Sequence, residues 1–169
     1  MHRAIFGFAT GLSRVCEVLA ALLVGAAITV NLAQVLWRYI LNDPLEWSEE
    51  VMRYTMVWVA FLAGSAGVFR GEHMAAGMLG NIESALVKRV LHYVILVSML
   101  IFSAVLAWWG TRYGFDTGQV SPAAQIPMEF PYLAVGFGGI LMVIKLVCLL
   151  LLPIEMVPQP GGMRPEDIA

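Results

Sequence analysis

Charged residues are scarce in this chain. Lysine and arginine together number 10 and aspartate and glutamate 12, so only 13% of the 169 residues are charged while 60% are hydrophobic. The mean hydropathy is +0.79. A water-soluble domain of this size has too little interior to bury so many apolar side chains. The composition therefore predicts an integral membrane protein.

The few charges are also nearly balanced. The formal net charge is −2 and the isoelectric point lies near 5.9, so the chain lacks the basic surface that binding to nucleic acid requires. It also lacks a G-x-x-x-x-G-K-[ST] segment, the loop whose amides hold nucleotide phosphates. These absences exclude nucleic acid as a partner and argue against the use of ATP by this chain.

Cysteine is rare as well. Cys16 and Cys148 are the two cysteines, and neither has a metal-ligand partner at a useful spacing. Free cysteines commonly behave as small buried apolar side chains. We expect that behaviour for both, and we predict no metal and no other cofactor.

Long apolar runs are what the sequence does contain. Four of them are long enough to cross a hydrocarbon core about 30 Å thick, which takes roughly 20 residues of helix. We place the spans near residues 16–37, 51–69, 90–111 and 128–150. The predicted fold class is therefore all-α, with a four-span membrane domain over residues 1–152 and a flexible cytoplasmic tail over residues 153–169.

The first span has an alternative interpretation as a cleaved secretory signal, because Arg3 and Arg14 precede an apolar stretch. We favour a retained span. Its apolar character continues past Ala27 to Trp37, which is longer than a typical signal core.

Basic residues are distributed unequally between the two sides of the membrane. An even number of spans places both termini on one side, which carries Arg3, Arg14, Arg70, Lys88, Arg89 and Arg164, against Arg38, Arg53 and Arg112 on the other. The positive-inside rule then predicts cytoplasmic termini. Lys145 is left out because its depth is open. It lies near the cytoplasmic surface if the fourth span begins at Met128, and it must snorkel or find a partner if the span begins at Tyr132.

The connection between spans two and three is amphipathic. Apolar residues recur every four positions at Met74, Met78, Ile82 and Leu86. This spacing predicts a short helix lying in the cytoplasmic interface. Three glycines in the segment weaken helix propensity, so a simple loop is the alternative.

Charge is concentrated between the first two spans. The segment Arg38–Tyr54, RYILNDPLEWSEEVMRY, holds four of the 12 acidic residues and two of the 10 basic ones. Asn42-Asp43-Pro44 predicts the end of one helix and the start of the next, with Asp43 and Glu46 forming a capping box. In the first span, Asn31, Gln34 and Arg38 lie on one side, and in the second Trp47, Glu50 and Tyr54 share a face.

Polar side chains at membrane depth generally face protein rather than lipid. We therefore predict a hydrogen-bonded junction, either between spans or with a partner protein. The candidate residues for this junction and for the exit of the second span are Asn31, Gln34, Arg38, Trp47, Glu49, Glu50, Arg53, Glu72 and His73.

Simpler alternatives remain for some of these residues. Trp37, Tyr39 and Trp47 are also typical of an aromatic belt at a membrane surface. Glu72 and His73 are equally consistent with solvated residues at a helix exit. A separate strip, Ala63, Gly67 and Gly71, predicts the close approach of another helix.

Two segments resemble the small membrane subunit of the tripartite ATP-independent periplasmic (TRAP) transporters. The first is NLAQVLWRYILNDPLEWSEEVMRYTMVWVAFLAGSAGVFRGEHM, residues 31–74, and the second is TGQVSPAAQIPM, residues 117–128. The most telling parts are Arg38-Tyr39, Pro44-Leu45, Trp47-Ser48-Glu49-Glu50, Arg53-Tyr54 and Arg70-Gly71-Glu72-His73. The resemblance covers most of the chain, except roughly the last fifteen residues.

The resemblance implies a multi-pass subunit in the bacterial inner membrane. In such systems a periplasmic substrate-binding protein delivers an organic anion, typically a carboxylate, to a large multi-span transport subunit. That subunit moves the anion inward by symport with an ion, commonly sodium. The small subunit is similar to a scaffold that packs against the large one in membrane lipid, and it is not an enzyme. The length of the chain suggests a separate rather than a fused subunit.

Two other functions are weighed against this one. A redox anchor would hold haem between His73 and His92, which requires both rings to face each other at one depth. A transporter in its own right would need internal repeats or a pair of broken helices, and the sequence shows neither.

Overall fold

The computed structural model describes residues 2–43, 45–69 and 85–151. Its helices are α1 (His2–Leu36), the π-helical turn η1 (Trp37–Leu41), α2 (Glu46–Phe69), α4 (Ala85–Asp116) and α5 (Glu129–Leu151). Within these ranges the only β pairing is one isolated bridge between Val120 and Pro127. The all-α prediction is confirmed.

Four helical segments are long and apolar enough to cross a membrane, as predicted. They are Ile5–Leu41, Glu46–Val68, Arg89–Asp116 and Glu129–Leu151. Most of the predicted interfacial helix, together with Glu72, His73 and the C-terminal tail, lies outside the described residues, whereas Leu86, the last apolar residue of its pattern, belongs to α4.

The first and third helices extend beyond the apolar runs that predicted them. Helix α1 begins at His2, well before the predicted start at residue 16, and α4 continues to Asp116, past residue 111. Charged residues such as Arg14 and Arg112 are good or acceptable helix formers. Hydropathy therefore marks the part of a helix that suits lipid, whereas the helix itself ends where the backbone changes direction.

The junction between α1 and α2 agrees with the sequence at one boundary and differs at the other. Asn42 follows η1 in a left-handed conformation (φ 50°), which ends the helix where predicted. Helix α2 starts at Glu46 rather than after Asp43. Ser48 donates to the Leu45 carbonyl from both its amide (3.1 Å) and its hydroxyl (2.6 Å). Because Glu46 is the first helical residue and not the third, the predicted capping box does not form, and that prediction was wrong.

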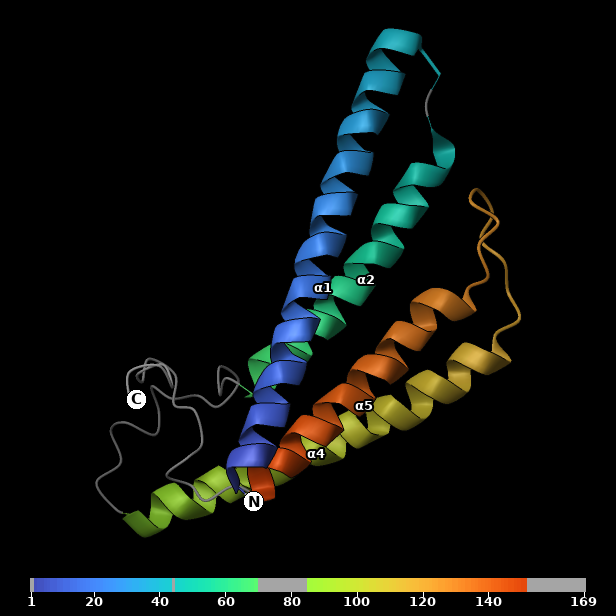
Figure 1. Ribbon diagram of the computed structural model, residues 1–169. Helices are drawn as coiled ribbons and strands as arrows, with labels where there is room; N and C mark the ends of the chain where they lie inside the picture. Colours follow the sequence, from blue (N-terminus) through green and yellow to red (C-terminus); the bar gives the residue numbers. More distant parts are fainter. Residues whose placement is uncertain (1, 44, 70–84, 152–169) are drawn as a thin grey trace, which may run out of the picture.

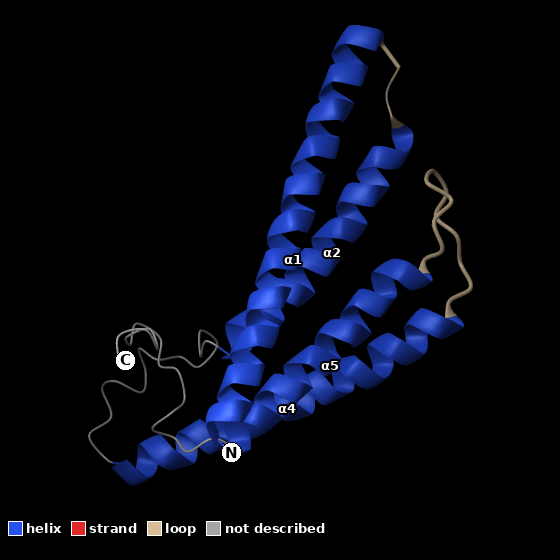
Figure 2. Cartoon of the chain, in the orientation of Figure 1, coloured by secondary structure: helices blue, strands red, loops and turns tan. Residues whose placement is uncertain are grey.

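The helices form two antiparallel hairpins, α1–α2 and α4–α5, and α2 packs against α5 between them. Figure 1 shows the hairpins diverging from the end at which α1 begins. Figure 2 shows both interhelix loops at the opposite end. At the end where α1 begins, the two hairpins share a core cluster that contains Ala9, Val68, Leu96, Leu146 and Leu149. The beginnings of α1 and α4 and the ends of α2 and α5 therefore meet on one side, as an even number of spans requires.

Glycines bring α4 and α5 into close contact. A Cβ atom at Gly139 would lie 2.6 Å from the Ala107 amide nitrogen, and one at Gly110 would lie 2.6 Å from the Gly136 amide nitrogen. Small residues at such positions let two membrane helices approach backbone to backbone. The strip of small residues that the sequence suggested for helix contact is not part of this α4–α5 pair. Ala63 and Gly67 lie in α2, where Ala63 is exposed and Gly67 is buried, and Gly71 lies outside the described residues.

A buried lysine ties three helices together. Lys145 of α5 has no exposed surface, and its Nζ donates to the carbonyl (3.0 Å) and hydroxyl (3.2 Å) oxygens of Ser65 in α2. It also contacts Cys16 Sγ in α1 at 3.6 Å, and Glu17 is near enough to attract it. Helix α5 begins at Glu129, next to the earlier of the two predicted starts, yet the ammonium lies inside and has found partners. Because burying an unpaired ammonium costs several kcal/mol, these contacts are a condition for the packing of α5.

We expect Gly139→Ala to destabilise the fold by about 1–3 kcal/mol, because the added methyl would overlap the α4 backbone. The unfolding midpoint of the protein in detergent measures the effect. Gly11→Ala is the matched control, since a Cβ there has no atom within 4 Å. Equal midpoints for the two variants would contradict the close α4–α5 contact.

We expect Lys145→Glu to prevent stable folding, because it places a carboxylate against the Ser65 carbonyl and near Glu17. Lys145→Met fills a similar volume without a charge and should retain the fold, as apolar replacements of buried ions often do. Monodispersity on size exclusion and the unfolding midpoint distinguish the two. A Lys145→Glu protein as stable as the parent would show that the ammonium does not lie at this contact.

Candidate functional site

The loop between α4 and α5 is a narrow hairpin that presents backbone amides at its tip. Two backbone hydrogen bonds close it, from Ser121 N to Ile126 O (2.9 Å) and from Met128 N to Gln119 O (2.8 Å). Gln125 takes a left-handed conformation with φ 51°. The turn, residues 122–125, lies beyond the inner of these two bonds, so its own amides are free to donate to another element.

Glu50 of α2 fills this tip. Its carboxylate accepts hydrogen bonds from the amides of Ala124 (2.8 Å) and Ala123 (3.4 Å) and from the hydroxyl of Ser121. Ser121 is buried and Glu50 is half-buried. Hydrogen bonds to an ionised carboxylate are about twice as strong as neutral ones, so a single side chain binds the loop firmly. We call this contact the Glu50 lock.

The contact continues along the same face of α2. Tyr54 donates a hydrogen bond to Met128 Sδ (3.4 Å), and the Trp58 ring lies 5.4 Å from Phe130 and tilted by 45°. Glu50, Tyr54 and Trp58 are spaced by four residues, which places them on one side of a helix. This side of α2 therefore meets the loop and then the start of α5.

A groove of about 350 Å³ lies below the lock, where the hairpins diverge. Its lining comes from α1, α2, the loop and α5, and includes Leu19, Leu23, Thr55, Trp58, Ile126 and Phe137. The hairpins do not pack continuously here. Beyond the groove, at the end that carries the interhelix loops, the Glu50 lock joins them again.

The other described candidates lie elsewhere. Gln34 is buried on α1, whereas Asn31 and Arg38 are exposed. The prediction that these three residues share one side assumed an unbroken α-helix. The π-helical turn η1 changes the register at Arg38. On α2, Trp47, Glu49 and Arg53 are exposed. Of the four carboxylates in the cluster, Glu50 is the one that the structure joins to the loop.

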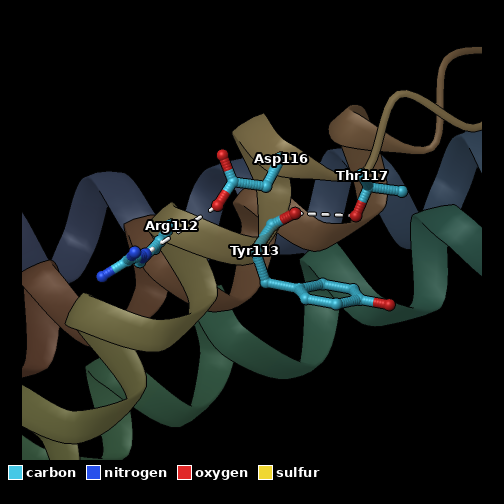
Figure 3. Close-up of polar contacts among 4 residues, drawn as sticks. All are labelled: Arg112, Tyr113, Asp116 and Thr117. Carbon is cyan, nitrogen blue, oxygen red and sulfur yellow. Dashed lines mark hydrogen bonds and ion pairs between the residues drawn. The ribbon is translucent and has the colours of Figure 1, made fainter.

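Sequence reasoning did not single out the end of α4. Figure 3 shows Arg112 paired with Asp116 at 3.8 Å and the Thr117 hydroxyl donating to the Tyr113 carbonyl at 2.7 Å. The Tyr113 ring meets Tyr132 of α5 edge to face at 5.0 Å. Both charged side chains are exposed, so the ion pair itself contributes little. The ring contact joins the last turn of α4 to the first turn of α5.

The proposed haem ligands and the cysteines can be located only in part. His92 is half-buried in α4 beside the Tyr93 ring, and His73 lies outside the described residues. Within the described ranges, histidine, cysteine and carboxylate side chains form no group of three that could hold a metal. Cys16 is buried as expected, and Cys148 is half-buried.

The family model for the DctQ component of tripartite ATP-independent periplasmic transporters matches residues 27–155 of the sequence. This range contains both Glu50 and the loop that binds it. The chain belongs to the DctQ family. It is thus a TRAP transporter subunit, and its four apolar helices make it a multi-pass protein of the bacterial inner membrane.

Three curated relatives of this DctQ-family chain show how far the similarity extends. A C4-dicarboxylate TRAP transporter small permease protein of Vibrio cholerae is 31% identical over 90 residues, which are 53% of this chain and 39% of the relative. A protein of the same name from Rhodobacter capsulatus is 28% identical over 101 residues, 58% of this chain and 44% of the relative. A Haemophilus influenzae protein, provisionally named a TRAP transporter small permease, is 22% identical over 133 residues, 78% of this chain and 82% of the relative. The matches therefore cover less than half of each C4-dicarboxylate relative.

We expect Glu50→Ala to release the α4–α5 loop and to lower the unfolding midpoint of the protein, because it removes the acceptor of three hydrogen bonds from the loop. Spin labels on the loop tip and on the start of α2 should report a broader distance distribution. Glu49→Ala is the matched control, because the neighbouring carboxylate is exposed. If both variants kept the parent's narrow distribution, the lock would not hold the hairpins.

Proposed function

We propose that this DctQ-family chain is the scaffold subunit of a TRAP transporter. It packs against a large multi-span transport subunit and widens that subunit's fixed platform in the lipid. A periplasmic binding protein delivers an organic carboxylate, and a sodium gradient drives its uptake through the large subunit. The chain itself has no catalytic role and holds no cofactor.

The observation that carries the proposal is the pair of polar contacts at the two ends of α2. Ser65 receives Lys145 of α5, and Glu50 receives the α4–α5 loop. The two residues are 15 positions apart, or about 22 Å of helix at 1.5 Å per residue. A helix bonded at both ends to the neighbouring hairpin cannot slide past it without breaking several hydrogen bonds. Such rigidity suits a stationary platform better than a moving carrier.

The proposal includes the orientation of the chain. With both termini in the cytoplasm, the end that carries Glu50 faces the periplasm. Asp43, Glu49 and Arg53 are exposed near that end. This charged surface is the part of the chain that a delivering binding protein would meet.

The class of substrate is supported by the names of two relatives, which are small permeases for C4-dicarboxylates. The groove described above is lined mainly by apolar side chains, so it offers no site for a carboxylate. We therefore assign recognition of the anion to the other two components.

The test is sodium-driven uptake by the three components in liposomes. We expect Glu50→Ala and Arg38→Ala to lower uptake and copurification with the large subunit by about tenfold or more. Arg164→Ala, in the C-terminal tail, should match the parent. Uptake by this chain alone, or undiminished uptake when it is omitted, would sink the proposal.

A further inference from the structure

Helix α1 uses only one side to pack within the chain. Ala9, Ser13, Cys16, Ala20 and Gln34 are buried, at the three- and four-residue spacing of one helix face. On an adjacent side, turned by roughly 100° from the buried one, a second set of residues is exposed, and Asn31 lies at its edge, three residues before the buried Gln34. These residues, which we call the outer face of α1, are Ala21, Gly25, Ile28, Asn31, Leu32 and Val35.

Asn31 makes this outer face unsuitable for lipid. Its side chain is exposed, and the structure shows no hydrogen bond from it to any described residue. It lies seven residues before Arg38, or about 10 Å of helix further into the membrane. An amide at that depth generally faces protein and pairs with a polar group on a neighbouring helix.

The missing side chain of Gly25, the glycine on this face, is not needed for any packing contact inside the chain. A Cβ atom at Gly25 would meet no atom within 4 Å. At Gly136 and Gly139, by contrast, the missing side chain is what allows α4 and α5 to touch. Glycine weakens a helix interior relative to alanine, and the space that it leaves on α1 admits the backbone of another helix.

The exposed side of α4 has a different character. From Val90 to Trp109 it presents large apolar side chains, including Val94, Val97, Ile101, Phe102, Val105 and Trp108. Its exposed Ser98 hydroxyl already donates to the Ile95 carbonyl at 2.8 Å, and its exposed tyrosine, Tyr93, is a residue type common at membrane interfaces. Such a surface is compatible with lipid without any partner, and the paired tryptophans suit a membrane interface.

From this contrast we infer that the outer face of α1 is the surface on which a membrane helix of the large transport subunit packs, with a hydrogen-bonding side chain opposite Asn31. The inference rests on the proposed function, because it names the surface that the scaffold uses. A lipid chain would leave the Asn31 amide unpaired, whereas a helix with a polar side chain at the same depth pairs it. The exposed face of α4 is the side turned toward lipid.

Photo-crosslinking in the assembled complex locates the contact directly. A benzophenone side chain introduced at Ile28 should crosslink to the large subunit, and one introduced at Ile101 of α4 should not. Crosslinking to the large subunit from Ile101 instead of Ile28 would overturn the inference. So would a crosslink from Ile28 to lipid alone or to a second copy of this chain.

Matched substitutions provide the second arm of the test. Ala21→Leu and Asn31→Leu should reduce the copurified large subunit at least about tenfold, while Ala104→Leu, an exposed alanine on α4, should leave it unchanged. The unfolding midpoints of the isolated variants should equal that of the parent, because all three positions are exposed. If the parent itself does not copurify with the large subunit, the proposed function fails. If the parent does and both α1 variants do as well, this inference fails while the proposed function stands.

Discussion

The hydrogen bonds that the α4–α5 loop donates to Glu50 are the contact on which the shape of the molecule depends. The hairpins pack together near the beginning of α1 and diverge from there. Without the lock, their far ends would be joined by the Tyr54–Met128 hydrogen bond and by the contact of Trp58 with Phe130. Because two of the donors are backbone amides, the loop must keep its hairpin geometry for the carboxylate to be satisfied. A single ionised side chain thereby orders an entire loop.

Helix α2 is the element that both polar contacts share. Glu50 anchors the loop at its start, and Ser65 accepts Lys145 near its end. Disrupting either contact leaves polar groups without partners: the buried Lys145 ammonium in one case, and the loop amides with the buried Ser121 hydroxyl in the other. The α4–α5 pair is held differently, by glycines that let the two backbones touch. Hydrogen bonds of charged side chains join the two hairpins, and backbone contact between α4 and α5 joins the helices of the second hairpin. Together these contacts make the chain rigid.

Much of the fold follows from local patterns in the sequence. Hydropathy places all four spans, and Asn42 ends the first helix as its conformational preference predicts. The capping box failed because a helix start depends on which carbonyl the first turn uses, and here Leu45 takes that role. The polar cluster was recognised as a junction, but its members separate in space: Glu50 joins the loop while Asn31 and Arg38 remain exposed. Spacing indicates which residues share a face and not what that face meets.

The sequence by itself determined that the protein is an integral membrane protein, because the balance of apolar and charged residues decides whether a folded chain is stable in water or in lipid. It also determined the family, through motifs around Glu50 and Ser121. Only the tertiary structure decided that these two motifs touch, that Lys145 reaches Cys16 and Ser65, and that glycines join α4 to α5. Each such contact joins residues distant along the chain. It exists only after the helices have packed, and no local pattern encodes it.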